Sequence, residues 1–344
     1  METVHYASLT RIADLPAWPL RHRILPRDEW EAGDYVVGRV LPFEGVVEAV
    51  ELASGREVAP LPGDLVVGAF ARRAATLEAV GSFREIEDDG LMHSMTEGGC
   101  FGRVTSRSMF ARPLFPLEYR GHVILDGGKV RMRDRVPAPP DTEYALPTVL
   151  MVGTSMSAGK THAARVAVRE LVGRGLRVVA AKVTGAGRYH DVLSLGDAGA
   201  HAVFDFVDAG LPTTVCPEAR FREAMDGLLR RMAATGADVA VIEAGASPLE
   251  PYNGRTAVEL LEPHLRFTTL CASDPYAVVG IRDAWGVEPS LVAGPTTNTS
   301  AAVELVRALS GLEALNLMRR ETHARFGELL AEALEDVLVG AGRA

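Results

Sequence analysis

The strongest constraint on the fold lies between residues 148 and 171, where an apolar run, a loop of small residues and a helical pattern follow one another. The apolar run at 148–152 predicts a short buried strand. The loop ends in Gly159-Lys160-Thr161, and the alanine- and valine-rich segment after it predicts a helix that continues to about residue 171. A strand, a small-residue loop, Gly-Lys-Thr and a helix form the ordered context of a phosphate-binding loop.

This loop predicts a nucleotide site in which each part has a role. Backbone N–H groups and the positive end of the helix dipole would converge on a polyphosphate. Lys160 would contact the β- and γ-phosphates, and the Thr161 hydroxyl would ligate Mg²⁺. The predicted phosphate-binding residues are nine in a row: Gly153, Thr154, Ser155, Met156, Ser157, Ala158, Gly159, Lys160 and Thr161. The first glycine, at position 153, stands one residue earlier than the usual spacing.

Lysine is rare in this chain, since only three of the 36 basic residues are lysine. Where arginine has replaced lysine elsewhere, a retained lysine indicates a need for a compact ammonium group. Lys160 lies in the phosphate loop, and Lys182 ends the next predicted strand. Both are predicted to be catalytic. Lys129 follows a Gly-Gly hairpin turn and is predicted to lie at the surface.

Helices and strands alternate after the phosphate loop, which predicts a parallel sheet. The predicted strands are 176–183, 238–246, 267–272 and 291–293, and the predicted helices are 197–207, 218–234, 301–309 and 322–338. Glu243 ends an apolar strand, as a Mg²⁺-organising acid does in phosphate-loop enzymes. Ligands of such sheets bind at the carboxyl ends of the strands. The loops there supply the candidate substrate residues Thr184, Gly185, Tyr252 and Asn253.

The residues before the phosphate loop have a different pattern. From residue 34 to about residue 136, short β runs separated by turns predict a small barrel or sandwich. Residues 136–147 contain four prolines, which is typical of a stiff linker. The predicted fold class is therefore α/β. A phosphate-loop domain at 148–344, with a mostly parallel sheet flanked by helices, follows a mainly-β domain at 1–137 and a linker at 138–147.

Composition narrows the classes of partner and location. A length of 344 residues allows two domains. The net charge of −9 disfavours a nucleic-acid partner. No apolar run approaches the roughly 18 residues of a membrane span, and no signal-peptide pattern is present, so we expect a cytoplasmic protein. Three widely spaced cysteines predict neither a disulfide nor a metal site. A homodimer or a higher homo-oligomer is expected, and either the N-terminal domain or a second copy would supply substrate contacts.

Three segments together resemble one known family. Gly153-Thr154 with Gly159-Lys160-Thr161, then Lys182-Val183-Thr184-Gly185, then Glu243-Ala244-Gly245-Ala246 are similar in order and spacing to the dethiobiotin synthetase group of P-loop NTPases. The resemblance implies that Lys182 faces phosphates or a carbamate. It also implies that Glu243 and an earlier aspartate, either Asp191 or Asp197, ligate Mg²⁺.

Two further comparisons refine this resemblance. The run at 202–210 is similar to that of fused-domain relatives that include D-glutamate N-acetyltransferase. Ser155 stands where partition-type ATPases of the same class carry an extra signature lysine, which argues against that mode of action.

Three functions remain open from the sequence. The first is an enzyme that uses ATP and Mg²⁺ for ligase- or kinase-type phosphoryl transfer to a small carboxylate- or amine-bearing metabolite. The second is a CoA-dependent N-acyltransferase that holds its cofactor in the phosphate loop. The third is a nucleotide-gated regulatory or binding protein. We predict the first, because the two lysines and Mg²⁺ would together place positive charge on the γ-phosphate.

Overall fold

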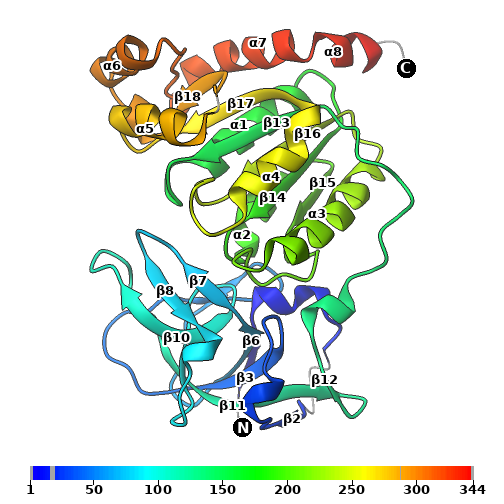
Figure 1. Cartoon of the computed structure of the whole chain (residues 1–344), viewed down its shortest axis with the longest axis vertical. Coiled ribbons are helices and arrows are strands. Elements are labelled where there is room, and N and C mark those ends of the chain that lie inside the picture. The colour runs from blue at the N-terminus through cyan, green and yellow to red at the C-terminus, as the bar shows by residue number, and fades with distance from the viewer. Residues whose placement is uncertain (1–2, 16–19, 287, 342–344) are drawn as a thin grey trace. The chain divides into compact units, whose positions relative to one another are not determined.

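The computed structural model describes residues 3–15, 20–286 and 288–341 (Figure 1). The chain divides into two compact units. The first comprises Met1–Ala138, Ala186–His190 and Phe206–Pro217, and the second comprises Pro139–Gly185, Asp191–Asp205 and Glu218–Ala344. Two short segments, 186–190 and 206–217, therefore group with the N-terminal strands although they follow the phosphate loop in sequence. The prediction of one linker between two continuous domains did not anticipate these segments.

The second unit contains a fully parallel sheet with the strand order β15-β14-β16-β13-β17-β18. Its inner strands are buried along almost their whole length, as expected where helices cover both faces of a parallel sheet. The strands are β13 Thr148–Gly153, β14 Val178–Thr184, β15 Ala202–Asp205, β16 Val239–Ala244, β17 Leu265–Cys271 and β18 Leu291–Ala293.

The helices of this unit are divided between the two faces of the sheet. They are α1 Lys160–Val172, α2 Tyr189–Asp197, α3 Glu218–Ala233, α4 Gly254–Leu261, α5 Pro275–Trp285, α6 Ser300–Ser310, α7 His323–Ala333 and α8 Glu335–Ala341. The step from β13 to β14 crosses the sheet in one direction, and the steps from β15 to β16 and from β16 to β17 cross it in the other. Because such crossovers are right-handed, α1 lies on the face opposite α3 and α4. Helices α3 and α4 pack together over their face in Figure 1, and α7 packs on α1.

The predicted parallel sheet with flanking helices is confirmed, but one predicted helix is wrong. Residues 197–207 do not form a helix, since α2 ends at Asp197 and β15 begins at Ala202. Gly199 adopts a φ of 110°, a conformation that stops a helix and suits glycine. The short strand then pairs with β14, and that pairing outweighs the helical preference of its alanine-rich flank. The predicted last helix, 322–338, is divided at Leu334 into α7 and α8.

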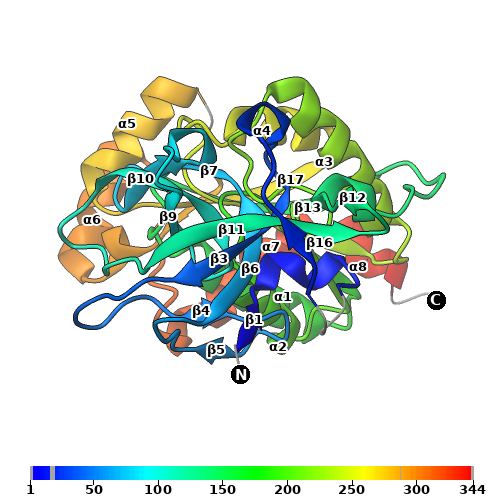
Figure 2. The same cartoon turned by 90° about the horizontal axis from the view of Figure 1, so that it is seen from below.

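The first unit contains a mixed sheet that closes on itself. The order β6-β3-β11-β9-β10 returns to β6 through an additional β6–β10 pairing, so these five strands form a closed ring. The long central strand β11 pairs with β3 and β9 (Figure 2). Closure gives each of these five strands a neighbour on both sides within the ring. The strands are β1 Val4–Tyr6, β2 His22–Arg23, β3 Tyr35–Val40, β4 Val50–Glu51, β5 Glu57–Val58, β6 Leu65–Phe70, β7 Arg72–Ala74, β8 Ala79–Ser82, β9 Leu91–Ser94, β10 Cys100–Arg107, β11 Pro116–Leu125 and β12 Gly128–Lys129.

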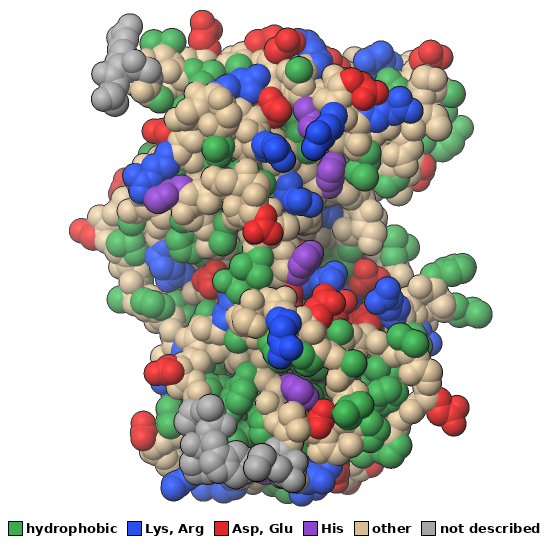
Figure 3. Space-filling view, turned by 180° about the vertical axis from the view of Figure 1, so that it is seen from behind, with side chains coloured by type: hydrophobic (Ala, Val, Ile, Leu, Met, Phe, Trp, Pro, Cys, Tyr) green, Lys and Arg blue, Asp and Glu red, His purple; other side chains and the backbone are tan. Residues whose placement is uncertain are grey.

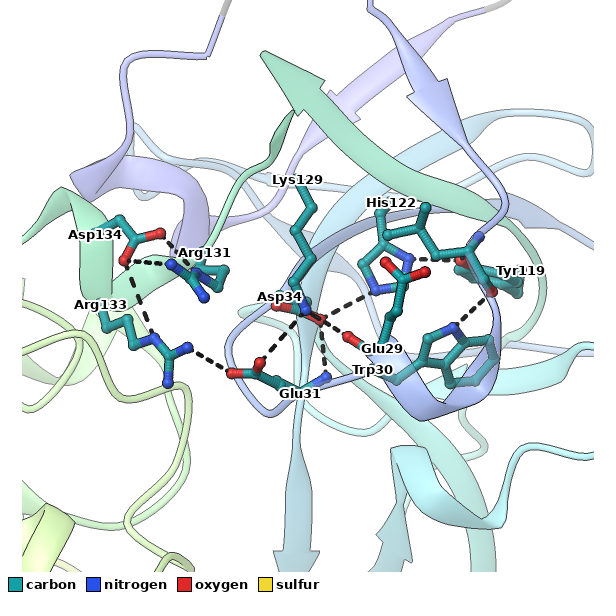
Figure 4. Close-up of polar contacts among 11 residues, drawn as sticks. Glu29, Trp30, Glu31, Asp34, Tyr119, His122, Lys129, Arg131, Arg133 and Asp134 are labelled. Atoms are coloured by element: carbon teal, nitrogen blue, oxygen red, sulfur yellow. Dashed lines mark hydrogen bonds and ion pairs between the residues drawn. The ribbon is translucent and has the colours of Figure 1, made fainter. Parts of the chain in front are cut away.

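A buried chain of polar groups crosses this unit (Figure 4). The Tyr119 hydroxyl lies 2.6 Å from Nδ1 of His122, and Nε2 of His122 lies 3.1 Å from Oδ2 of Asp34. The ammonium group of Lys129 donates to the same carboxylate at 2.9 Å. Burial alone would raise the pKa of Asp34, but the bonds from His122 and Lys129 outweigh it and lower that pKa. The prediction that Lys129 lies at the surface is wrong, because its side chain is only 17% exposed.

Charged side chains of both signs share the outer surface. On the face shown in Figure 3, Lys and Arg side chains are interspersed with Asp and Glu side chains. Within residues 3–15, 20–286 and 288–341, no helix combines the length and the apolar character needed to cross a bilayer.

The aromatic core of the first unit generates a stability prediction. Phe70 is fully buried, stacks on Phe83 at 5.4 Å between ring centroids and lies 4.8 Å from Trp30. We expect Phe70→Ala to lower the free energy of unfolding by about 3–5 kcal/mol, because it removes buried apolar surface and leaves a cavity. Urea denaturation followed by tryptophan fluorescence measures this, since Trp30 lies against the altered side chain. The matched control is Phe110→Ala, at a fully exposed phenylalanine of the same unit, with an expected change within about 0.5 kcal/mol. Equal losses in the two variants would contradict the prediction.

Candidate functional site

The phosphate loop connects β13 to α1 and encloses the Lys160 side chain. Gly159 has a φ of 93° and immediately precedes the helix. Lys160 is 2% exposed, and its Nζ donates to the carbonyl oxygens of Ser155 at 2.6 Å and Met156 at 3.3 Å. A Cβ at Gly153 would lie 2.9 Å from this Nζ, so the Lys160 side chain packs closely against the glycine.

Thr161, in the first turn of α1, meets Glu243, near the carboxyl end of β16. Glu243 is the next-to-last residue of β16, which is buried throughout, and its register places it beside Met151 of β13 and Lys182 of β14. The Thr161 hydroxyl donates to Oε2 of Glu243 at 2.8 Å. Two residues 82 positions apart are thus joined at the start of α1 by oxygen atoms of the kind that Mg²⁺ prefers.

A row of charged side chains crosses three neighbouring strands. Lys182 lies in register with Glu243 on one side and with Asp205 of β15 on the other. In-register neighbours of a parallel sheet point to the same face, so the basic Lys182 lies between the acidic Asp205 and Glu243. Lys182 also forms an ion pair with Asp191, at the start of α2. Burial alone would lower the pKa of Lys182, but the charges of Asp191 and Glu243 outweigh burial and raise that pKa.

Lys160 has the opposite electrostatic balance. Burial lowers the pKa of its ammonium group, and the charge of Glu243 offsets this only in part. Its hydrogen-bond partners are neutral carbonyls, whereas Lys182 has a direct carboxylate partner. An incoming polyanion would therefore stabilise the charge of Lys160 more than its present partners do.

The two aspartates left open as Mg²⁺ ligands occupy different places. Asp191 lies in the first turn of α2 and contacts Lys182. Asp197 is the last residue of the same helix and is exposed. Of the two aspartates, Asp191 is therefore the one that contacts the predicted catalytic Lys182.

Of the four candidate substrate residues, Thr184 and Gly185 lie directly after Lys182, whereas Tyr252 and Asn253 lie in the segment before α4. Thr184 and Gly185 follow Lys182 at the carboxyl end of β14, where Thr184 is buried and its hydroxyl donates to the Gly245 carbonyl at 2.9 Å. Tyr252 is fully enclosed, so its ring is part of the core. Asn253 immediately precedes α4 with a φ of 58°.

Sequence reasoning missed a second loop that packs on the phosphate loop. A Cβ at Gly294 would lie 2.4 Å from the carbonyl oxygen of Ala158, and Gly294 itself has a φ of 91°. The backbone N–H of Thr154 donates to the Cys271 carbonyl at 3.0 Å. Burial raises the pKa of the Cys271 thiol to about 12, so this thiol stays neutral behind the loop. The Gly-Pro pair after the predicted strand 291–293 was the only sequence signal of a special backbone there.

Asp205 was missed for a different reason. It ends the run Ala202-Val203-Phe204, which was assigned to a helix. An apolar run that ends in an acid is the same signal that identified Glu243. Asp205 is 1% exposed.

The donor set fits Mg²⁺ bound together with a nucleotide. Among the residues that the structure describes, no three or more His, Cys, Asp or Glu side chains come together closely enough to hold a metal ion by themselves. Mg²⁺ in nucleotide sites takes one or two protein oxygens and completes its shell with phosphates and water. The joined Thr161 hydroxyl and Glu243 carboxylate match that requirement.

Comparison with known proteins gives partial structural likenesses only. No protein-family model matches the chain, and no curated protein sequence matches it. A DUF1611 family protein from Anabaena variabilis is 17% identical over 58% of this chain and 63% of its own, with a TM-score of 0.32. The signal recognition particle receptor FtsY from Elizabethkingia anophelis is 14% identical over 55% of this chain and 68% of its own, with a TM-score of 0.35. A ParA family ATPase from Chlorobium tepidum is 14% identical over 58% of this chain and 100% of its own, with a TM-score of 0.33.

The close approach of Gly294 to the phosphate loop is testable. We expect Gly294→Ala to displace the loop, because the added Cβ would overlap the Ala158 carbonyl, and to speed amide hydrogen exchange across residues 153–159. The control is Gly311→Ala, whose φ of 72° is also left-handed but whose Cβ would meet open space. Both variants carry a backbone cost of about 1–2 kcal/mol. Unchanged exchange in residues 153–159 of Gly294→Ala would contradict the prediction.

Proposed function

We propose that the second unit binds Mg²⁺–ATP and transfers the γ-phosphoryl group to a small metabolite that carries a carboxylate or an amine. The observation that carries this proposal is the hydrogen bond between Thr161 and Glu243 beside the enclosed Lys160. It joins the start of the helix after the phosphate loop to the acid at the end of β16. That combination is what a polyphosphate with Mg²⁺ requires.

The residues present can perform the tasks of phosphoryl transfer. Lys160 would exchange the carbonyls of Ser155 and Met156 for phosphate oxygens, and Lys182 would face the transferring group from the neighbouring strand. Mg²⁺, when bound through Thr161 and Glu243, would neutralise charge on the phosphates. Preorganised charges of this kind lower the barrier without being rearranged during the reaction.

The chemical outcome depends on the acceptor. A metabolite carboxylate oxygen that attacks the γ-phosphorus forms an acyl phosphate as the bond to the β-phosphate oxygen breaks and ADP leaves. An amine that then attacks the acyl carbon releases phosphate and gives an amide, which is ligase chemistry. A hydroxyl acceptor would stop at a phosphate ester, which is kinase chemistry.

We propose a cytoplasmic protein, acting as a homodimer or higher homo-oligomer, without a nucleic-acid or membrane partner. The net charge of −9 supports the exclusion of nucleic acid.

A thermal-shift screen with ATP, GTP, acetyl-CoA and Mg²⁺ tests the proposal. ATP with Mg²⁺ at about 100 times its dissociation constant should add about 2.7 kcal/mol of stability. Lys160→Ala should abolish this shift, and Lys129→Ala should keep it, because Lys129 lies in the first unit's polar chain. Glu243→Gln should keep ATP binding but remove most of its dependence on Mg²⁺.

The alternatives predict different results in the same screen. An acyltransferase would be stabilised by acetyl-CoA and would form no ADP. A nucleotide-gated regulatory protein would hydrolyse ATP at a rate that no metabolite changes. The absence of a shift with any nucleotide would refute the proposal.

The lowered pKa of Lys160 gives a pH prediction with a defined sign. The charged ammonium binds phosphate, so ATP affinity should fall as pH rises, beginning below the ordinary lysine pKa of 10.5. Lys182 cannot produce this loss, because its pKa is raised and it stays charged over that range. Lys160→Arg should abolish the alkaline loss, and Lys182→Arg should keep it. Measurement of the ATP dissociation constant between neutral and alkaline pH decides this, and a loss that disappears only in Lys182→Arg would contradict the assignment.

A further inference from the structure

Glu51, the last residue of β4, is fully buried and binds the first backbone N–H groups of α2. Its Oε2 accepts from the N–H of Tyr189 at 2.7 Å, and its Oε1 accepts from the N–H of His190 at 2.6 Å. The Ser8 hydroxyl donates to Oε2 as well. The first N–H groups of a helix have no partners within it, and a carboxylate is also favoured at the positive end of the helix dipole. Glu51 therefore holds the first turn of α2 by charge and by hydrogen bonds.

Other groups of the first unit bind the short segment 186–190 that leads into this turn. The Thr96 hydroxyl donates to the Gly187 carbonyl at 3.1 Å. The Arg11 guanidinium lies over the Tyr189 ring, 4.4 Å from its centroid. The segment is thus fixed by backbone bonds and by stacking, all within the unit to which it belongs.

We propose that Glu51 is a positioning residue for Asp191. The chain passes from the first unit to the second at the bond between His190 and Asp191. Asp191 then pairs with Lys182. Because Glu51 fixes the backbone at 189–190, it also fixes the point from which the Asp191 side chain starts. The inference rests on the proposed function, in which Asp191 and Lys182 flank a bound Mg²⁺–nucleotide.

Glu51→Gln changes this contact with little change in volume. The glutamine side chain has one acceptor oxygen, and its amide N–H₂ would face a backbone N–H that also donates. One of the two N–H groups at the start of α2 would lose its partner. The first turn should then loosen, and Asp191 should contact Lys182 for a smaller fraction of the time.

Lysine labelling measures this loosening without any nucleotide. The chain has only three lysines, so acetylation by an N-hydroxysuccinimide ester, followed by mass spectrometry, gives a separate rate for each. We expect Lys182 to react about tenfold faster in Glu51→Gln, since loss of a supporting partner typically changes a site by about 10–100-fold. The rate of Lys129 should stay unchanged. The control is Glu57→Gln, which removes an exposed carboxylate 3.7 Å from Arg188 of the same segment and should leave Lys182 protected. Equal rates for Lys182 in wild type and Glu51→Gln would overturn the inference.

A double-variant test separates positioning from general destabilisation. With ATP present, the Mg²⁺ concentration for half-saturation should rise about tenfold in Glu51→Gln and also in Asp191→Asn. Their combination should be no weaker than Asp191→Asn alone, because residues that act through one another are not additive. Additive losses would overturn the inference. If the wild type binds no Mg²⁺–ATP while Lys182 still reacts faster in Glu51→Gln, the proposed function fails and the positioning role stands.

Discussion

Two ammonium groups are buried at the carboxyl edge of a parallel sheet, and the organisation of the site follows from the cost of burying them. An isolated buried charge is strongly unfavourable, so each must find partners. Lys182 is held between Asp191, Glu243 and Asp205, and it stays charged. Lys160 has only carbonyl partners and a more remote acid. The charge of Lys182 is thus balanced by neighbouring carboxylates. The charge of Lys160 has no direct carboxylate partner, so a bound anion would stabilise it.

Much of this site could be predicted because its signals are local. The strand, loop and helix around Lys160 lie within a few residues of one another, and the apolar run that ends in Glu243 needs no partner to be recognised. Thr299 is of a residue type that favours helix N-caps, and its side chain accepts from the N–H of Ala302 at the start of α6. Where hydrophobic periodicity, capping and turn chemistry agree within one segment, the sequence determines the element.

The failures come from interactions between residues far apart in the chain. Residues 202–205 are a strand because β14 lies beside them, and no local pattern carries that information. Lys129 follows an exposed turn, yet it reaches the buried Asp34, 95 residues away. The carboxylate of Glu51 also binds residues that are distant in sequence, since its partners at 189–190 lie about 138 positions later. A buried charge reveals its partner only after the fold has brought the two together.

The short segment that leads into Asp191 belongs to the first unit, although the strand before it belongs to the second. A loop between β14 and α2 that was free in solvent would leave Asp191 with many conformations, and ordering it when a ligand binds would cost conformational entropy. Here the segment 186–190 is already bound by Glu51 and its neighbours in the first unit. That ordering occurs once, during folding, and electrostatic stabilisation is most effective when charges are held in place beforehand. The backbone from which Asp191 starts is therefore ordered by the fold itself.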